Sequence, residues 1–496
     1  MGRGKEVRKL NRRVELRAGR ARARIQPMSK TSKRLVLSVA LYLFAYSLAH
    51  AQQTRPETEK QLARDIYKQF IEFPSGFTTG STTPIAEAAA ARLKAAGFSD
   101  ADVFVGGAIA KKANLVARYR GRGAQRPILL LAHIDVVEAK REDWSMDPFQ
   151  FIEKDGYFYG RGTGDDKAQA AVWLANLIQY KKEGFQSDRD IIVALTADEE
   201  GGGPYNGVNW LLKNHRDLID ADFALNEGGW GDESKGKKIS NNLQVSEKYV
   251  LNFRFEVRNK GGHSSLPVRD NAIYRLAGAL QRLADFGFPL KTNEVTAAYF
   301  QEMGKIETGP IKDALGRVEA GDEGAMQRVA AASPAWNATL RTTCVATMLE
   351  GGHAINALPQ LAAAMVNCRV LPEDSPEYVL STLQKVVADN QVSVKPLNTD
   401  TAKAPASPMR PDVLKAVSDT TQRMWPGVPT IPIMVMGATD GRYLRAEGIP
   451  CYGVQGFFLD RDDIRFHGRD ERMGVQSFYE GQAFLYELVK SLSSGK

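Results

Sequence analysis

The sequence predicts an α/β protein with a mainly parallel sheet, helices on both faces of that sheet, and an inserted α+β domain. In the first half of the chain, apolar runs of strand length alternate with segments of helical periodicity. Such alternation is typical of a parallel sheet covered by helices on both faces. From residue 248 onward, apolar and polar residues alternate, which is typical of an antiparallel strand with one exposed face. The 496 residues are also too many for a single core.

Each predicted element follows from its own pattern. Helices are expected at 59–73 and 84–98, and buried strands follow at 127–137, 190–200 and 221–229. A helix at 165–184 ends at a glycine and joins the first two of these strands. The inserted part has strands beginning at 248 and at 361, with a helix at 271–287, and the first pattern resumes with strands at 431–440 and 449–457 and a helix at 477–492. These changes predict domain parts at 52–247 and 399–496, an insertion at 248–398, and a linker at 400–408.

Residues 1–51 have the pattern of a leader. A basic segment beginning at Met28 precedes an apolar stretch at 35–49 and an Ala-His-Ala cleavage pattern that ends at Ala51. This pattern predicts a signal peptide cleaved after Ala51, and a periplasmic or secreted protein with no stable membrane anchor. An uncleaved anchor is the alternative, for which the apolar stretch is short. Residues 1–27 are interpreted as lying before the true start at Met28; a genuine basic extension is the other interpretation.

The basic net charge belongs to the leader alone. The whole chain has 66 Lys and Arg residues against 58 Asp and Glu, a net charge of +8. The leader has 13 of the basic residues and only two of the acids, which leaves 53 basic and 56 acidic residues in 52–496. A nucleic-acid-binding protein would be expected to have a basic surface even without its leader. The charge therefore argues against a nucleic-acid partner.

Three cysteines, Cys344, Cys368 and Cys451, cannot form a complete disulfide framework. A Cys344–Cys368 bridge is compatible with an oxidising compartment. The favoured interpretation is that all three are small buried apolar residues. Zinc-finger and CxxC spacings are absent from the sequence.

Histidines and acids gather where the predicted strands end. Ligands of parallel sheets bind at the carboxyl ends of the strands. Any one of these residues could be structural; Asp165, for example, could simply cap the helix that follows its glycine-rich turn. Imidazoles and carboxylates together are typical zinc ligands, and two zinc ions could neutralise this density of acids. The candidates, all at strand ends or glycine turns, are His133, Asp135, Asp165, Glu199, Glu200, Glu227 and His467.

The ordered motifs resemble a known family. LLLAHIDVV, GRGTGDDK, TADEEGGG, NEGG, KGGHSSLP, GGHAINALP and FHGRDE occur in this order between residues 60 and 490. Together they resemble the zinc-dependent exopeptidases and deacylases that include carboxypeptidase G, succinyl-diaminopimelate desuccinylase and the aminoacylases. In layout the chain is most similar to the larger carboxypeptidase S-like members. The resemblance implies a dizinc catalytic domain and an inserted domain that acts as a lid or dimerisation domain.

The resemblance also implies a role for each candidate. His133 and Glu227 would bind one Zn²⁺, Glu200 and His467 would bind the other, and Asp165 would bridge both; Co²⁺ or Mn²⁺ can substitute for zinc. Asp135 would orient His133, and Glu199 would be the general base that takes a proton from water.

The inserted domain would bind the substrate. By resemblance, His263 would polarise the scissile carbonyl, in many relatives from a partner subunit. Asn356 and Arg369 would bind the substrate carbonyl and the terminal carboxylate, although a turn residue and a surface charge are the plain alternatives. Asn367 departs from the family, where many members have an acid two residues before the arginine. The stretch 291–350 is longer than in compact relatives and is expected to cover the pocket or alter dimerisation.

The expected activity is hydrolysis of one amide bond beside a free carboxylate, by a carboxypeptidase- or dipeptidase-like metallohydrolase. An N-acyl-amino-acid amidohydrolase with the same residues is the close alternative, and a catalytically silent peptide-binding relative is the alternative from another class. The substrate would be a small peptide or an N-acyl amino acid, and a homodimer is also expected.

Overall fold

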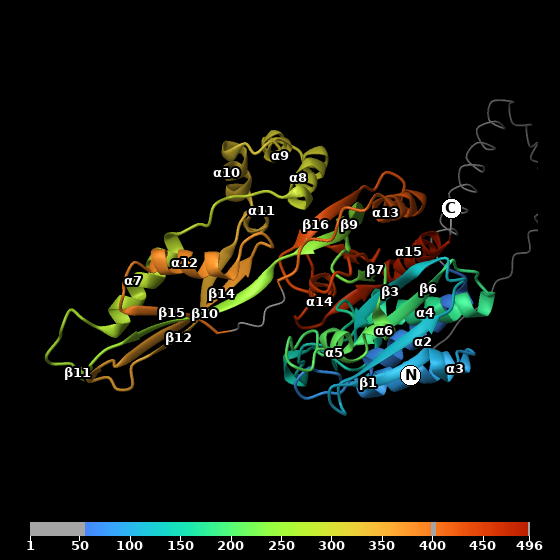
Figure 1. The fold of residues 1–496 in the computed structure, drawn as a ribbon, viewed down its shortest axis with the longest axis horizontal. Helices are drawn as coiled ribbons and strands as arrows, with labels where there is room; N and C mark the ends of the chain where they lie inside the picture. Colours follow the sequence, from blue (N-terminus) through green and yellow to red (C-terminus); the bar gives the residue numbers. More distant parts are fainter. Residues whose placement is uncertain (1–54, 398–402, 495–496) are drawn as a thin grey trace, which may run out of the picture. The chain divides into compact units, whose positions relative to one another are not determined.

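The computed structural model describes residues 55–397 and 403–494 (Figure 1). The predicted leader and part of the predicted linker lie outside these residues. In the part of the chain that is described, no helix is both long enough and apolar enough to span a membrane.

A large mixed sheet, mainly parallel at its centre, forms the main domain and confirms the predicted fold class. Strand β3 lies between β6 and β7 and runs parallel to both. The sheet continues through β17, which is parallel to β7, while β1, β2 and β8 add antiparallel pairs toward the edges. In sheet order the strands are β1 (Val103–Gly107), β2 (Ala113–Tyr119), β6 (Arg189–Thr196), β3 (Gln125–His133), β7 (Phe223–Asn226), β17 (Cys451–Gly453), β9 (Lys237–Glu247), β8 (Gly231–Ser234) and β18 (Phe458–Asp460), with β16 (Thr430–Val435) paired to β9.

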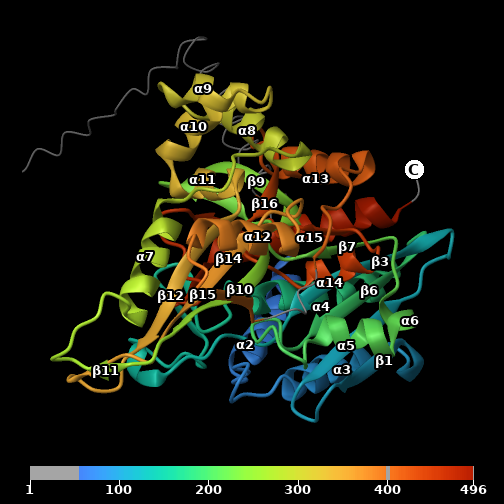
Figure 2. The same ribbon diagram turned by 60° about the vertical axis from the view of Figure 1, so that its left-hand side comes forward.

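Helices lie on both faces of this sheet (Figures 1 and 2). An apolar core lies on each face, because successive strand side chains point to opposite faces. The larger core contains side chains of α2 (Glu57–Ile71), α3 (Thr83–Ala95), α4 (Lys167–Glu183), α13 (Pro411–Met424) and α15 (Val475–Ser493). The smaller core contains side chains of α5 (Gly207–Asn214), α6 (Arg216–Ile219) and α14 (Gly441–Ala446).

Helix α4 ends where the sequence predicts, at Gly184, which has the left-handed backbone that favours glycine (φ 64°). Its residues 167–180 are buried all round. Helix α2 and helix α15 cover the side of α4 that faces away from the sheet.

The inserted residues form a second, antiparallel sheet in the order β12 (Thr343–Gly351), β14 (Leu361–Val370), β10 (Tyr249–Arg258) and β15 (Val392–Pro396). Side chains along β10 alternate between buried and half-buried, as its sequence predicts. Helices α7 (Ala272–Asp285) and α12 (Pro376–Val387) share a core with this sheet.

Most of the long stretch that departs from compact relatives is helical, and its last residues belong to β12. It folds into α8 (Glu294–Ile306), α9 (Ile311–Val318), α10 (Glu323–Ala332) and α11 (Pro334–Leu340), which have an apolar core of their own. Helix α8 packs against β16 of the main sheet. Two small antiparallel sheets complete the fold: β11 (Gly262–His263) with β13 (Ala357–Leu358), and β5 (Tyr157–Tyr159) between β4 (Ile152–Lys154) and β19 (Arg472–Gly474).

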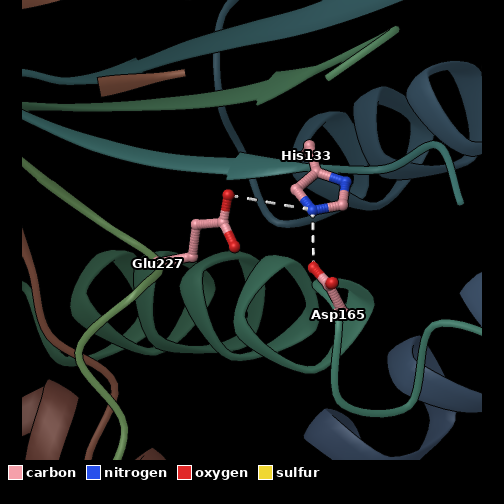
Figure 3. A group of neighbouring side chains, drawn as sticks. All are labelled: His133, Asp165 and Glu227. Atoms are coloured by element: carbon pink, nitrogen blue, oxygen red, sulfur yellow. Dashed lines mark hydrogen bonds and ion pairs between the residues drawn. The ribbon is translucent and has the colours of Figure 1, made fainter. Parts of the chain in front are cut away.

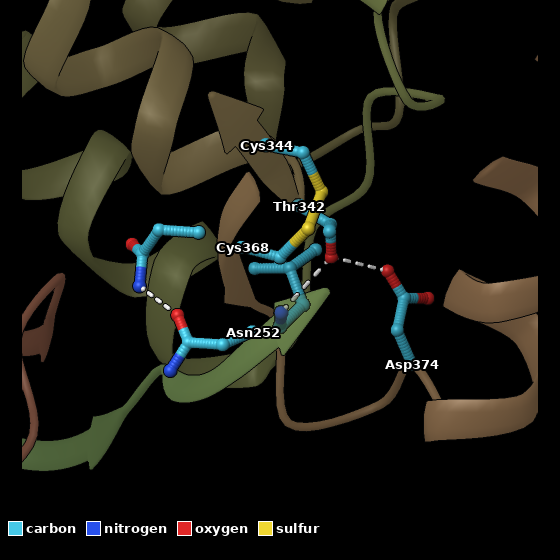
Figure 4. The surroundings of a disulfide bond; sticks show 7 residues. Asn252, Thr342, Cys344, Cys368 and Asp374 are labelled. Carbon is cyan, nitrogen blue, oxygen red and sulfur yellow. Dashed lines mark hydrogen bonds between the residues drawn. A yellow bond between two sulfur atoms is a disulfide. The ribbon is translucent and has the colours of Figure 1, made fainter. Parts of the chain in front are cut away.

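A disulfide joins Cys344 to Cys368 (Figure 4), so the favoured interpretation of these two residues as unpaired was wrong. The reason is the strand register: β12 and β14 place the two residues directly opposite each other, where side chains of an antiparallel pair meet. Register between strands that lie far apart in the sequence cannot be read from spacing. Cys451 is free and buried, as expected.

Candidate metal centre

The acidic residues lie just beyond the strands and not within them. Strand β3 ends at His133, β6 ends at Thr196, and β7 ends at Asn226. Glu199 and Glu200 therefore belong to the turn after β6, and their orientations are set by that turn and not by strand alternation. Each predicted strand was too long by a few residues because the polar groups follow the apolar runs without a break.

The structure brings the five predicted metal ligands together in two groups. His133, Asp165 and Glu227 form one group, and Asp165, Glu200 and His467 form the other; in each, the candidate ligand atoms lie within 4.8 Å of one another. Figure 3 shows His133 Nε2 pointing at Asp165 Oδ1 (2.9 Å), with Glu227 Oε1 3.9 Å away. In the second group, His467 Nε2 lies 3.1 Å from Asp165 Oδ2 and 3.0 Å from Glu200 Oε1. Asp165 thus offers one oxygen to each group.

Asp135 connects the end of β3 to the turn after β6. Its Oδ1 accepts a hydrogen bond from the backbone N–H of Glu199, and its Oδ2 accepts one from the backbone N–H of Glu200 (both 3.1 Å). The ring of His133 contacts the backbone of Asp135, with Nδ1 3.1 Å from the carbonyl oxygen and 3.7 Å from the carboxylate. Asp135 is therefore placed to position the two glutamates as well as the histidine.

Glu471 holds the glycine turn that presents Asp165. Its carboxylate accepts hydrogen bonds from the backbone N–H groups of Gly162, Gly164 and Asp165 (3.1, 2.7 and 3.2 Å) and pairs with Arg161 (2.7 Å). Asp166, at the start of α4, makes no side-chain capping bond, and its Oδ2 is buried without a partner. A capping role does not explain this pair of acids.

The site concentrates negative charge at positions that are mostly half-buried. Burial raises the pKa of Asp135 to about 6 and raises the pKa of Glu199 and Glu227 well above the usual range. Hydrogen bonds to Asp165 and Glu200 raise the pKa of His467 to about 10. Buried carboxylates at this density need cationic partners. The donor set of imidazole nitrogens and carboxylate oxygens therefore fits two divalent cations that share Asp165.

Two arginines from different parts of the fold lie near each other, and one of them is near Glu199. Arg369 is at the end of β14, and burial together with the neighbouring guanidinium of Arg442 lowers its pKa. Arg442, on α14 of the main domain, is half-buried near Gly202 and feels the charge of Glu199. Neither arginine has an ion-pair partner among the described residues. Two guanidinium groups without an ion-pair partner can hold an anion.

His263 and Asn356 lie elsewhere. They meet at the β11–β13 strand pair, where Ser264 N donates to Asn356 O (3.0 Å), and both side chains are exposed. Strand β10 begins opposite Val370 and ends opposite Leu361, so Arg369 and the β11–β13 pair lie toward opposite ends of a ten-residue strand pair. Such a pair spans about 30 Å. One chain therefore does not bring His263 and Asn356 to Arg369.

Sequence reasoning missed Glu471, Arg161 and Arg442. Glu471 and Arg161 lie within the FHGRDE and GRGTGDDK motifs, but their partnership spans 310 residues. Arg442 is at the start of α14, seven residues after β16 ends at Val435, and it follows Asp440 closely; this acid after an apolar run was the available signal. Asn367, the departure from the family, donates from Nδ2 to Asn252 Oδ1 (2.8 Å).

Comparisons with known proteins agree with this geometry. The family model described as peptidase family M20/M25/M40 matches residues 129–491. The chain is 30% identical over 375 residues to human N-fatty-acyl-amino acid synthase/hydrolase PM20D1, covering 74% of each chain. It is 29% identical over 388 residues to probable carboxypeptidase S-like 2 of Dictyostelium discoideum, covering 76% of this chain and 74% of the relative.

Solved structures share the fold. The M20 metallo-carboxypeptidase Sso-CP2 from Sulfolobus solfataricus aligns with a TM-score of 0.64 at 17% identity, over 86% of this chain and 98% of its own. The di-peptidase Dug1p from Saccharomyces cerevisiae also has a TM-score of 0.64, at 15% identity, over 90% and 98% of the two chains. The predicted family resemblance is confirmed: the chain belongs to peptidase family M20/M25/M40 and is a hydrolase of its metallopeptidase and amidohydrolase class.

Proposed function

We propose that this protein is an exported dizinc hydrolase that cleaves one amide bond next to a free carboxylate, as a carboxypeptidase or dipeptidase does. The observation that carries the proposal is the pair of histidine–carboxylate groups sharing Asp165. Glu199 directly precedes Glu200 of these groups, Arg442 is close enough to feel its charge, and Arg369 is near Arg442. The first feature suits metal-assisted hydrolysis, and the second suits an anionic end of the substrate.

In this proposal His133, Glu227 and Asp165 hold one Zn²⁺, while Asp165, Glu200 and His467 hold the other. When bound, zinc supplies Lewis acidity that polarises the amide carbonyl and makes water more acidic. Glu199 accepts the proton of the attacking water and passes it to the leaving amine. A raised pKa favours the protonated form of Glu199, which cannot act as a base. Bound cations would offset the surrounding carboxylates and restore the ionised form that accepts the proton.

Arg369 and Arg442 bind the free carboxylate of the substrate. A guanidinium offers parallel N–H donors that match a carboxylate, and partial burial strengthens the contact. Because Arg369 comes from the inserted sheet and Arg442 from the main domain, one bound carboxylate would join the two parts of the chain.

A homodimer is part of the proposal, because His263 and Asn356 act on substrate only if a second chain presents its β11–β13 strand pair. The outer strand β12 supports such pairing: Val345, Met348 and Leu349 expose 60%, 66% and 72% of their surface. Exposed apolar residues on an unpaired sheet edge are a template for association.

Export is proposed from the leader pattern, with maturation to Gln52 in the periplasm or outside the cell. The Cys344–Cys368 disulfide supports this location, since disulfides persist in oxidising compartments.

An N-acyl-amino-acid amidohydrolase is the second candidate, favoured by the similarity to PM20D1 and to human aminoacylase-1, which is 26% identical over 382 residues. The test is a hydrolysis screen of the zinc-loaded protein against dipeptides and N-acyl amino acids, each also prepared with an amidated carboxylate. We expect turnover of free acids of one class and little turnover of the amides. Turnover that ignores the carboxylate would refute the proposal.

A further inference from the structure

A cavity of about 350 Å³ lies between the helical segment 294–340 and the main sheet. One wall comes from β16 and the residues after it, including Ile433, Val435 and Met436. Tyr299 of α8 and Ala335 of α11 form the facing wall. Ile433, Val435 and Met436 are only half-buried, although Met434 between them belongs to the main core.

The cavity is one aromatic layer away from the metal centre. Its floor includes Trp230, three residues after Glu227. The ring of Trp230 meets the ring of Phe466 edge-on (centroids 5.8 Å apart), and Phe466 directly precedes His467. Phe466 also packs against Gly164, so closely that there is no room for a Cβ there, and Gly164 directly precedes Asp165. Phe466 thus lies between the cavity and Asp165.

The walls of the cavity are mainly apolar. The carboxylate of Asp232 is the one charge among its lining residues, and it is satisfied by Asn242 Nδ2 (3.2 Å) and Ser240 Oγ (3.3 Å). The hydroxyl of Tyr299 accepts a hydrogen bond from Trp336 Nε1 (3.2 Å). Thr339 Oγ1 donates to Ala335 O (3.0 Å). The polar groups named here are therefore already paired and do not call for a polar ligand.

A second cavity of about 370 Å³ borders Phe466, and its walls are charged where those of the first cavity are apolar. Charged side chains line it, among them Glu233, Lys238, Arg465 and Arg472. An apolar group would lose hydration without gaining apolar contacts there. Of the two cavities beside the metal centre, only the one against β16 suits an apolar ligand.

We infer that the cavity against β16 is a specificity pocket that receives an extended apolar group of the substrate. Its volume is within the range of ligand pockets. This inference rests on the proposed function. An apolar group could come from the N-acyl chain of an acyl amino acid or from the side chain of a hydrophobic residue, and both would bury CH₂ groups against the same side chains.

The measurement is a pair of ligand series tested on the zinc-loaded protein. One series extends the acyl chain of an N-acyl amino acid from acetyl to dodecanoyl; the other keeps an N-acetyl group and extends the amino-acid side chain from alanine to norleucine. Burial of each methylene is expected to raise affinity about fourfold until the pocket is full. The series that shows this slope identifies which group enters. Dissociation constants measured on the Glu199→Gln protein give this slope without requiring turnover.

Ala335→Trp tests whether the slope belongs to this cavity. Ala335 is exposed on α11 and lines the pocket, so an indole there would fill space without disturbing the core. Ala332→Trp is the matched control, since Ala332 is exposed at the end of α10 and outside the pocket lining. We expect Ala335→Trp to weaken binding of the longest members at least tenfold and to change N-acetylalanine binding by less than threefold, and Ala332→Trp to behave as wild type. Equal melting temperatures would exclude misfolding.

If the dissociation constant does not change with chain length in either series, the inference of a specificity pocket is wrong. It is also wrong if Ala335→Trp leaves the dependence on chain length unchanged. Failure of every free acid to be hydrolysed would overturn the proposed function instead, because the binding slopes are measured separately from turnover.

Discussion

Arg161 and Glu471 form a buried ion pair, with Nη1 and Oε2 2.7 Å apart and side chains 3% and 1% exposed. The pair joins the glycine turn of Asp165 to the C-terminal segment of His467, since Arg161 also donates to Gly468 O (2.9 Å). Two candidate ligands that are 302 residues apart in the sequence, Asp165 and His467, are thereby held in one place.

Arg161→Ala should lower the free energy of unfolding by about 3–5 kcal/mol, because it leaves the charge of Glu471 buried and unpaired. Urea unfolding measures the loss. Lys415→Ala is the control: it breaks the exposed Lys415–Asp419 pair on α13 and should cost about 1 kcal/mol or less. Arg161→Ala should also bind zinc more weakly than wild type, which equilibrium dialysis detects. Comparable losses in the two variants would mean that the Arg161–Glu471 pair has no special structural role.

Glu199→Gln should abolish most turnover while both metal sites remain filled. The substitution keeps size and hydrogen bonding but removes the proton acceptor, and loss of a general base costs about 10²–10⁴-fold in rate. Glu200→Gln should instead reduce the zinc content, since Oε1 of Glu200 belongs to the group with His467. Metal analysis beside kcat distinguishes the two. The opposite pattern would show that their roles are exchanged.

Arg369→Ala should reduce kcat/KM for free-acid substrates about 10- to 150-fold, the equivalent of losing a hydrogen bond to a charged group. Arg442→Ala should act on the same substrates in the same direction. Both losses should shrink for amidated substrates, which have no anion to bind. Arg254→Ala, on neighbouring β10 and paired with Glu256, is the control and should leave kcat/KM unchanged. Equal losses on acids and amides would contradict the carboxylate role.

The stability of the protein should depend on Lys248 in a defined pH range. Burial and the charge of Arg369 lower the pKa of Lys248 to about 7, while its ammonium donates to Arg341 O (2.7 Å). Between pH 7 and the ordinary lysine pKa near 10.5, Lys248 is protonated in the unfolded chain but mostly deprotonated in the folded protein. Because the unfolded state then binds more protons, the contribution of Lys248 to the free energy of unfolding rises with pH. The stability of wild type relative to Lys248→Met should therefore increase from pH 7 to 9 in urea titrations. Parallel pH curves for the two proteins would refute this.

The mature exported protein should begin at Gln52. The leader's basic segment, apolar stretch and Ala-His-Ala pattern are the reason. N-terminal sequencing of protein recovered from a periplasmic fraction is the measurement. Mature protein that retains residues 1–27 would contradict both the cleavage site and the start at Met28.

The sequence by itself determined the fold class and the metal centre's candidate residues. Apolar runs alternating with helical segments predict a parallel sheet from local periodicity, and polar groups at strand ends converge because parallel strands end at one edge. His133, Asp165, Glu200, Glu227 and His467 could be selected for this reason, and the structure groups all five.

The tertiary structure alone decided which distant groups meet. Strand register placed Cys344 opposite Cys368, and the packing of α14 near the end of β14 set Arg442 near Arg369. The same register put His263 and Asn356 about 30 Å from Arg369, although all three were predicted to bind one substrate. The spacing of apolar residues indicates which side of each helix or strand is buried. Contacts between segments depend on packing across the whole chain, which no local pattern contains.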